Sequence, residues 1–208
     1  MDLNIRILKT TMRMLQQLGV SSTTMDAIAK ECGISKRTLY EHFPDKLTLI
    51  TEALKYNNTQ CKLQLEQIFR ESSNQLDALL KTYTEVRKQV STTSAALRND
   101  INRMYPSLRS EYQKIQTQNN KALLEILKQG QEEDMIRTDT ELEISVNLFA
   151  LALRNPELSQ MANQNNIPLV KVLDTLFINF LRSIASKKGM VYIDTFIKSN
   201  ITDYNIII

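Results

Sequence analysis

Residues 23–46, TTMDAIAKECGISKRTLYEHFPDK, are the stretch that decides the fold of this chain of 208 residues. Its first half has the apolar spacing of a short helix, and Gly33 can take the positive φ that a sharp turn needs. Ser35 can then cap a second short helix, which carries Lys36 and Arg37. This layout is typical of a helix-turn-helix, in which the second helix enters the major groove of DNA.

The residues before this stretch predict another helix. Apolar side chains recur at helical spacing over residues 3–18, and Gly19 supplies a stop signal. Thr23, followed by Asp26 three residues later, is expected to form the capping box of the next helix. Three helices of this size bury little surface, so we expect this unit to depend on packing against later parts of the chain.

The rest of the chain predicts a longer series of helices. Pro44 and Asp45 suit the first turn of a long fourth helix, since Pro tolerates that position and Asp complements the helix dipole. Residues 130–137 have the polar composition of a loop, and residues 189–208 could form a last helix, an extended tail or a frayed end. Further helices are expected over 73–90, 93–104, 107–129, 139–153 and 168–185.

The expected fold is therefore all-α. A three-helix helix-turn-helix DNA-binding domain, residues 1–46, precedes a larger helical domain for ligand binding and dimerisation, residues 47–208. The 42% apolar content supports a real core, whereas the net charge of +3 is too small to argue for nucleic acid without the motif. No apolar run approaches the ~20 residues of a membrane span. Neither Cys32 nor Cys61 has a partner at metal-ligand spacing, which fits a cytoplasmic protein without disulfides.

Residues 139–153 and 168–185 each carry apolar side chains on two faces. A surface helix needs only one apolar stripe, so two faces indicate burial on two sides. One side would belong to the chain's own core and the other to the same helix pair of a second subunit, giving a two-fold symmetric homodimer. The alternative is a monomer in which both are central core helices. The expected interface residues are Leu142, Val146, Phe149, Leu169, Leu173, Phe177, Phe180 and Ile184.

The first fifty residues resemble the TetR family of bacterial transcriptional regulators. Two positions depart from the family pattern: Arg37 stands where a small residue, often Gly, is usual, and Leu47 stands where Glu is common. The first departure suggests a base preference of its own. The matching residues are Leu15 and Gly19, Thr23-Thr24, Ile28-Ala29, Gly33-Ile34-Ser35, Thr38-Leu39-Tyr40, His42-Phe43 and Lys46.

The resemblance implies a repressor that binds a palindromic, double-stranded DNA operator as a homodimer and is released by a small-molecule effector. Arg37 is the expected base reader, because Arg near the helix start can reach guanine acceptors. Lys36 could instead be a phosphate contact or a solvated charge, Tyr40 could also be a core aromatic, and the lone His42 could be structural. By resemblance, Thr24, Tyr40, His42 and Lys46 contact phosphates, and Ser35, Lys36, Arg37 and Thr38 lie at or near the groove.

No motif for catalysis is present, so neither an enzyme nor a cofactor is expected. A single histidine also excludes a histidine-rich metal site. Three interpretations stay open: a ligand-responsive repressor, a regulator without a small-molecule effector, and a helical dimerisation protein with a decayed DNA-binding unit. Candidate ligand contacts, with ordinary core as the alternative, are Phe69, Tyr83, Met104, Tyr105 and Phe149.

Overall fold

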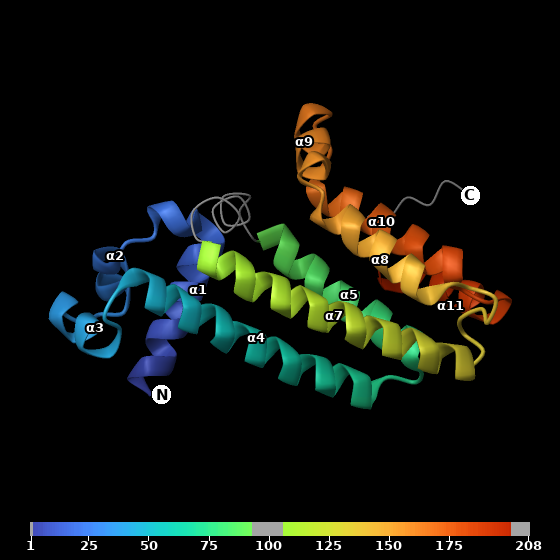
Figure 1. Ribbon diagram of the computed structural model, residues 1–208, viewed down its shortest axis with the longest axis horizontal. Helices are drawn as coiled ribbons and strands as arrows, with labels where there is room; N and C mark the ends of the chain where they lie inside the picture. Colours follow the sequence, from blue (N-terminus) through green and yellow to red (C-terminus); the bar gives the residue numbers. More distant parts are fainter. Residues whose placement is uncertain (1, 93–105, 201–208) are drawn as a thin grey trace. The chain divides into compact units, whose positions relative to one another are not determined.

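The computed structural model describes residues 2–92 and 106–200, and it confirms the all-α prediction for this part of the chain (Figure 1). None of the described helices is long and apolar enough to cross a membrane. The predicted helix over 93–104 lies outside the described residues. The helices are α1 Leu3–Ser22, α2 Met25–Glu31, α3 Lys36–His42, α4 Lys46–Glu71, α5 Gln75–Thr92, α7 Pro106–Glu132, α8 Leu142–Arg154, α9 Pro156–Gln164, α10 Leu169–Ile184 and α11 Lys187–Asn200.

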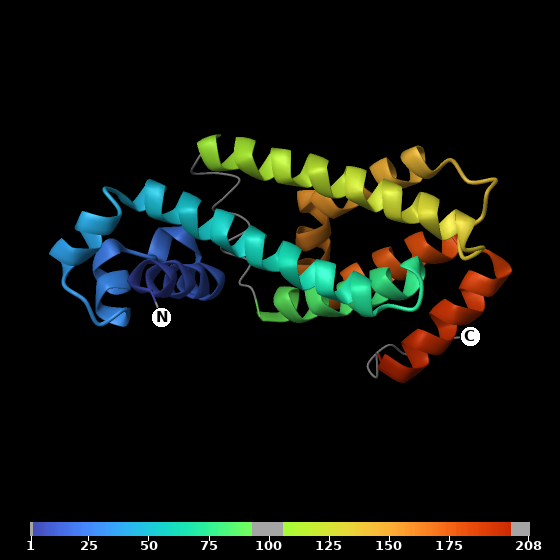
Figure 2. The ribbon, with the colours of Figure 1, turned by 90° about the horizontal axis from the view of Figure 1, so that it is seen from below.

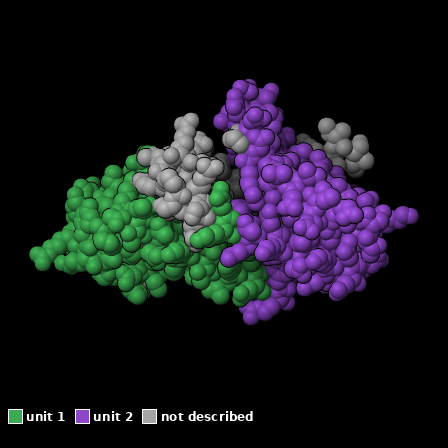
Figure 3. Space-filling model, viewed as in Figure 1, with its two compact units in different colours: residues 1–67, 92–114 green, residues 68–91, 115–208 purple. Residues whose placement is uncertain are grey.

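The chain divides into two compact units, which Figure 3 draws in different colours. Unit 1 comprises residues 1–67 and 92–114, and unit 2 comprises residues 68–91 and 115–208. Each unit has hydrophobic side chains of its own packed together, so each is described by itself.

In unit 1, α2 packs against α1, and α3 packs against α2 (Figures 1 and 2). Gly19 has φ +78° inside α1, so the helical conformation is interrupted at the predicted stop. The prediction that Thr23 caps α2 is wrong by one residue, because the cap is Thr24, whose hydroxyl accepts from Ala27 N at 3.1 Å. The Thr23 hydroxyl is buried and donates to the Gly19 carbonyl at 2.7 Å instead.

The core of unit 1 is built from one face of each of its first helices. Asp45 precedes α4 and caps it, since its Oδ1 accepts from Thr48 N at 2.7 Å. Cys32 is buried in this core. The largest fully buried side chains of the unit are Ile7, Leu15, Ile28, Leu39, Leu49 and Ile50.

Unit 2 is a helical layer in which α8 and α10 run side by side (Figure 1). The polar loop predicted over 130–137 is present only in part: α7 continues to Glu132, and in the loop that follows the side chains of Met135 and Ile136 are buried. Ile136 pairs with Ala185 in an isolated antiparallel bridge. These two segments pack closely enough that a side chain at Gly189 would collide with the Met135 carbonyl.

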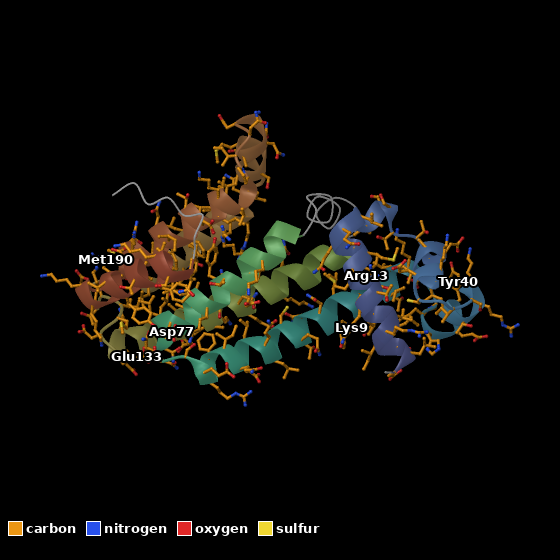
Figure 4. The ribbon with its side chains drawn as sticks, turned by 180° about the vertical axis from the view of Figure 1, so that it is seen from behind. Lys9, Arg13, Tyr40, Asp77, Glu133 and Met190 are labelled. Atoms are coloured by element: carbon orange, nitrogen blue, oxygen red, sulfur yellow. The ribbon has the colours of Figure 1, made fainter. Side chains whose placement is uncertain are left out.

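Two further elements of unit 2 differ from, or add to, the sequence expectation. Helix α9 was not predicted; it begins at Pro156 and is capped by Asn155, whose Oδ1 accepts from Glu157 N at 2.9 Å. The region after residue 189, left open by the sequence, is helical as α11 up to Asn200. Figure 4 labels Met190 on this helix.

Candidate nucleic-acid interface

The turn between α2 and α3 is fixed by backbone hydrogen bonds. Gly33 N donates to Lys30 O and Ile34 N donates to Ala29 O, both at 3.0 Å, which is the pattern of a Schellman motif. Gly33 has φ +64°, and a Cβ added there would meet no atom within 4 Å. Glycine is therefore required by the backbone conformation and not by lack of space.

Helix α3 is capped at its start and packs one face against the core, and its other face is exposed to solvent. Ser35 caps it as predicted, since Ser35 Oγ accepts from Thr38 N at 3.0 Å. Leu39 is fully buried and Phe43 is 7% exposed, so both anchor the helix to the core as expected. The opposite face is exposed and includes Tyr40, which is labelled in Figure 4.

The structure brings the predicted DNA contacts together on α3 and at its two flanks. The ion pair between Asp26 and Lys36 joins the start of α2 to the start of α3. Thr24, Ser35, Lys36, Arg37, Tyr40 and His42 are exposed, whereas Thr38 and Lys46 are half-buried. Among the described residues, no group of three His, Cys, Asp or Glu side chains is placed to hold a metal ion.

Both cations at the start of α3 have carboxylate partners. Lys36 Nζ lies 2.7 Å from Asp26 Oδ1, and Arg37 Nε lies 3.1 Å from Glu41 Oε1. The hydrogen bond to Asp26 and the charge of Asp26 raise the pKa of Lys36 above its ordinary value. All four side chains are exposed, so these pairs contribute little to the stability of the fold.

Lys46 has a structural contact that the sequence did not predict. Its Nζ donates a 2.7 Å hydrogen bond to the carbonyl of Val20, near the end of α1. This bond joins the first residue of α4 to the segment that leads into α2. Lys46 therefore helps to hold the three-helix unit together, whatever contact it makes with DNA.

Three of the candidate ligand contacts, Phe69, Tyr83 and Phe149, belong to unit 2 and lie in different surroundings. Tyr83 is buried and its ring stacks on Phe177 with centroids 3.9 Å apart, while Phe149 stacks on Phe180 at 4.4 Å. Phe69 is half-buried in α4. Met104 and Tyr105 lie outside the described residues.

A buried polar group near these rings was missed by the sequence reasoning. Asp174 is 2% exposed, and its Oδ1 accepts from the Tyr83 hydroxyl at 2.7 Å. Arg87 Nε donates to both carboxylate oxygens, at 3.0 and 3.1 Å. A signal existed, because Asp174 is a single acidic residue in the apolar run LVKVLDTLF of α10.

The structure assigns the two apolar faces of α8 to different surroundings. Of the predicted interface residues, Leu142, Val146, Phe177, Phe180 and Ile184 lie in the core of unit 2, and Phe149 packs against it. Leu169 and Leu173 are half-buried. The other α8 face is exposed: Ile144, Leu148 and Leu151 have relative exposures of 58%, 62% and 63%.

The DNA-binding unit is similar to a known family. Residues 7–53 match the family described as "Bacterial regulatory proteins, tetR family". The chain is also 45% identical over 51 residues to the uncharacterized HTH-type transcriptional regulator YerO of Bacillus subtilis (strain 168). That similarity covers 24% of this chain and only 18% of YerO, so it concerns the DNA-binding unit alone.

Solved structures share the fold over most of the chain. The reduced form of E. coli NemR has a TM-score of 0.70 and 16% identity, covering 89% of this chain and 98% of NemR. A transcriptional regulator from Saccharomonospora viridis, solved in complex with choline, has a TM-score of 0.67 and 16% identity, covering 88% and 97%. At these identities the similarity establishes the fold.

Proposed function

We propose that this chain, whose residues 7–53 match the tetR family of bacterial regulatory proteins, is a transcriptional regulator that represses transcription by binding a palindromic operator as a homodimer. A small molecule bound in the C-terminal part releases it from DNA. In this proposal residues 1–46 bind DNA, and residues 47–208 dimerise and sense the effector. Since bacterial operators lie in the cytoplasm, the protein acts there.

The observation that carries the proposal is that α3 is anchored to the core on one side and exposes its other side to solvent. The helix is capped by Ser35 and anchored by Leu39, and its exposed face carries Lys36 and Arg37 close to its start. Residues near the start of a recognition helix are those that reach base edges. Arg37 reads a guanine, while the phosphate contacts of Thr24, Tyr40, His42 and Lys46 fix the register.

Dimerisation is supported by the exposed stripe of α8. Ile144, Leu148 and Leu151 are spaced as i, i+4 and i+7, so they lie along one side of the helix. Three large apolar side chains in a row on a surface mark an interaction site. Two copies joined through α8 and α10 would present two recognition helices to half-sites about 34–36 Å apart, one turn of B-DNA.

Release requires an effector that prefers the DNA-incompetent state. A ligand in residues 47–208 would shift α4, which begins next to the DNA-binding unit, and so change the spacing of the two recognition helices. A preference of about 10⁴-fold for that state converts a 1:99 population into 99:1. Operator DNA must then weaken effector binding by the same factor.

A regulator without a small-molecule effector, constitutive or controlled by a protein partner, is the second candidate. It is favoured by the contact of Tyr83 with Phe177 and of Phe149 with Phe180, because these rings pack on each other within unit 2. Thermal unfolding of the full chain with choline and with a panel of small organic ions separates the two. A compound that raises the unfolding midpoint and lowers operator affinity supports regulation by a small-molecule effector. If no compound does both, the regulator without an effector is favoured.

The DNA-binding proposal is tested by selecting sequences from a randomised duplex pool with the full-length protein. We expect the bound fraction to converge on a palindrome with two half-sites. Convergence on a single, asymmetric half-site would contradict the dimer, and no enrichment would contradict sequence-specific binding.

A further inference from the structure

Arg37 and Glu41 form an ion pair on the exposed face of α3. They are one helical turn apart, and Arg37 Nε donates to Glu41 Oε1 at 3.1 Å. The Arg37 side chain is 90% exposed and that of Glu41 is 59% exposed, so both project from the protein. A carboxylate in this position faces DNA phosphates in the proposed complex, which by itself opposes binding.

The contact occupies only part of the guanidinium group. Arginine has five N–H donors in a rigid planar fork, one on Nε and four on the two terminal nitrogens. Glu41 takes the Nε donor, and the pair therefore leaves the end of the fork available. That end is the part that matches the O6 and N7 acceptors of guanine in a bidentate contact.

From this geometry we infer that Glu41 is a positioning residue for base recognition. It holds Arg37 through Nε, with the two terminal nitrogens directed outward to one guanine, and it thereby sharpens the preference at that base pair. The inference rests on the proposed role of Arg37. The Glu41 carboxylate repels DNA phosphates and so lowers the affinity for all DNA. It also raises the ratio of the affinity for the correct base pair to the affinity for the wrong ones.

The test compares full-length variants on the selected operator and on its single base-pair substitutions, by fluorescence anisotropy. A bidentate Arg–guanine contact is worth about fivefold to 150-fold in discrimination. We expect Glu41→Ala to lower the ratio of affinities between the correct and the substituted base pair about twofold, at the base pair that Arg37→Ala relaxes. Affinity for all other substitutions should rise together, and the thermal midpoint should change little, because Glu41 is exposed.

Asp26→Asn is the matched control. Asp26 pairs with the neighbouring cation Lys36 at 2.7 Å, and both side chains are similarly exposed. Its loss should raise affinity for every sequence by a similar factor without changing any base preference. If Glu41→Ala behaves in the same way, the carboxylate acts only through its charge and the inference is wrong.

Two other outcomes separate this inference from the role of Arg37. If Glu41→Ala alters a base pair other than the one relaxed by Arg37→Ala, Glu41 reads that base itself and does not position Arg37. If Arg37→Ala weakens binding to all sequences equally, the proposed base reading by Arg37 fails and the positioning role fails with it. In the double variant, the Glu41 substitution should change only overall affinity.

Discussion

The Tyr83 hydroxyl and Arg87 Nε both donate to the carboxylate of Asp174, at 2.7 Å and at 3.0 and 3.1 Å, inside the core of unit 2. The carboxylate is 2% exposed and joins α5 to α10. A buried charge is tolerated only where partners of this kind replace water. The contacts of Asp174 with Tyr83 and Arg87 therefore fix how α5 packs against α10.

Asp174→Ala should be much more damaging than loss of one of its neutral donors. It leaves the Arg87 guanidinium, which is 27% exposed, without its carboxylate, and we expect unfolding free energy to fall by about 2–3 kcal/mol. Tyr83→Phe removes one hydrogen bond and should cost about 1 kcal/mol. Urea unfolding of both variants measures the difference. Equal losses would show that the ion pair contributes nothing beyond a neutral hydrogen bond.

Gly33→Ala should destabilise the DNA-binding unit through the backbone alone. Gly33 has φ +64° with open space around it, so the cost is that of a left-handed conformation, about 1 kcal/mol. Gly33→Asn should recover part of this loss, since Asn tolerates that conformation better. Thermal unfolding of the two variants provides the measurement, and an Ala variant as stable as the original would contradict the turn geometry.

Stability should fall in acid because two helix starts use ionised carboxylates. Burial opposes ionisation of Asp77, but hydrogen bonds from Lys81 and Ser73 outweigh it and hold the Asp77 pKa below its ordinary value of 3.8. Hydrogen bonds from Thr48 lower the pKa of Asp45 in the same direction. Because the folded pKa values are the lower ones, this stabilisation is present above pH 3.8 and is lost as pH falls through the folded values.

Asp77→Asn isolates one of these contributions. Asp77 lies at the start of α5, beside the contact between Gln75 N and Glu133 Oε2 at 2.7 Å, and Figure 4 labels Asp77 and Glu133 at this end of the unit. We expect Asp77→Asn to lower the free energy of unfolding by about 1 kcal/mol at pH 6. Between pH 5 and pH 3 the free energy of unfolding of the variant should fall less steeply than that of the original protein. An unchanged decline would mean that other carboxylates govern acid unfolding.

The exposed α8 stripe gives a dimer test that does not disturb the core. Leu148→Glu places a charge at a position that is 62% exposed, so the protomer should stay folded while dimers dissociate. Val146→Glu is the contrasting variant: Val146 is 3% exposed, and a charge there should unfold unit 2. Light scattering and circular dichroism distinguish the two results. A Leu148→Glu protein that remains dimeric would exclude this face as the interface.

Local signals predicted the DNA-binding unit well. Gly33 and Ser35 have the turn and cap roles expected of them, because these roles depend on the residues themselves and on near neighbours in the chain. The error at Thr23 has the same local origin. Two adjacent threonines can both cap, and the choice depends on the Gly19 carbonyl, which accepts from Thr23 and leaves Thr24 as the cap.

Tertiary packing explains what the sequence did not predict. The two apolar faces of α8 were visible, but periodicity does not say which of them packs in the chain's own core, so Val146 was expected at the interface and Leu148 was not. The partnership of Asp174 with Arg87 joins residues 87 positions apart, which no local pattern contains. Helix α9, by contrast, has a local start signal in the sequence, because Asn155 can cap a helix and Pro156 suits its first turn.

The most direct test of base reading by α3 is the affinity of the full-length protein and of Arg37→Ala for the selected operator, compared with each single base-pair substitution. We expect the original protein to prefer its operator, and Arg37→Ala to lose about 1–3 kcal/mol there and to relax one base pair in each half-site. An equal loss on every sequence would contradict base reading by Arg37. Equal affinity of the original protein for operator and random duplex would contradict sequence-specific regulation altogether.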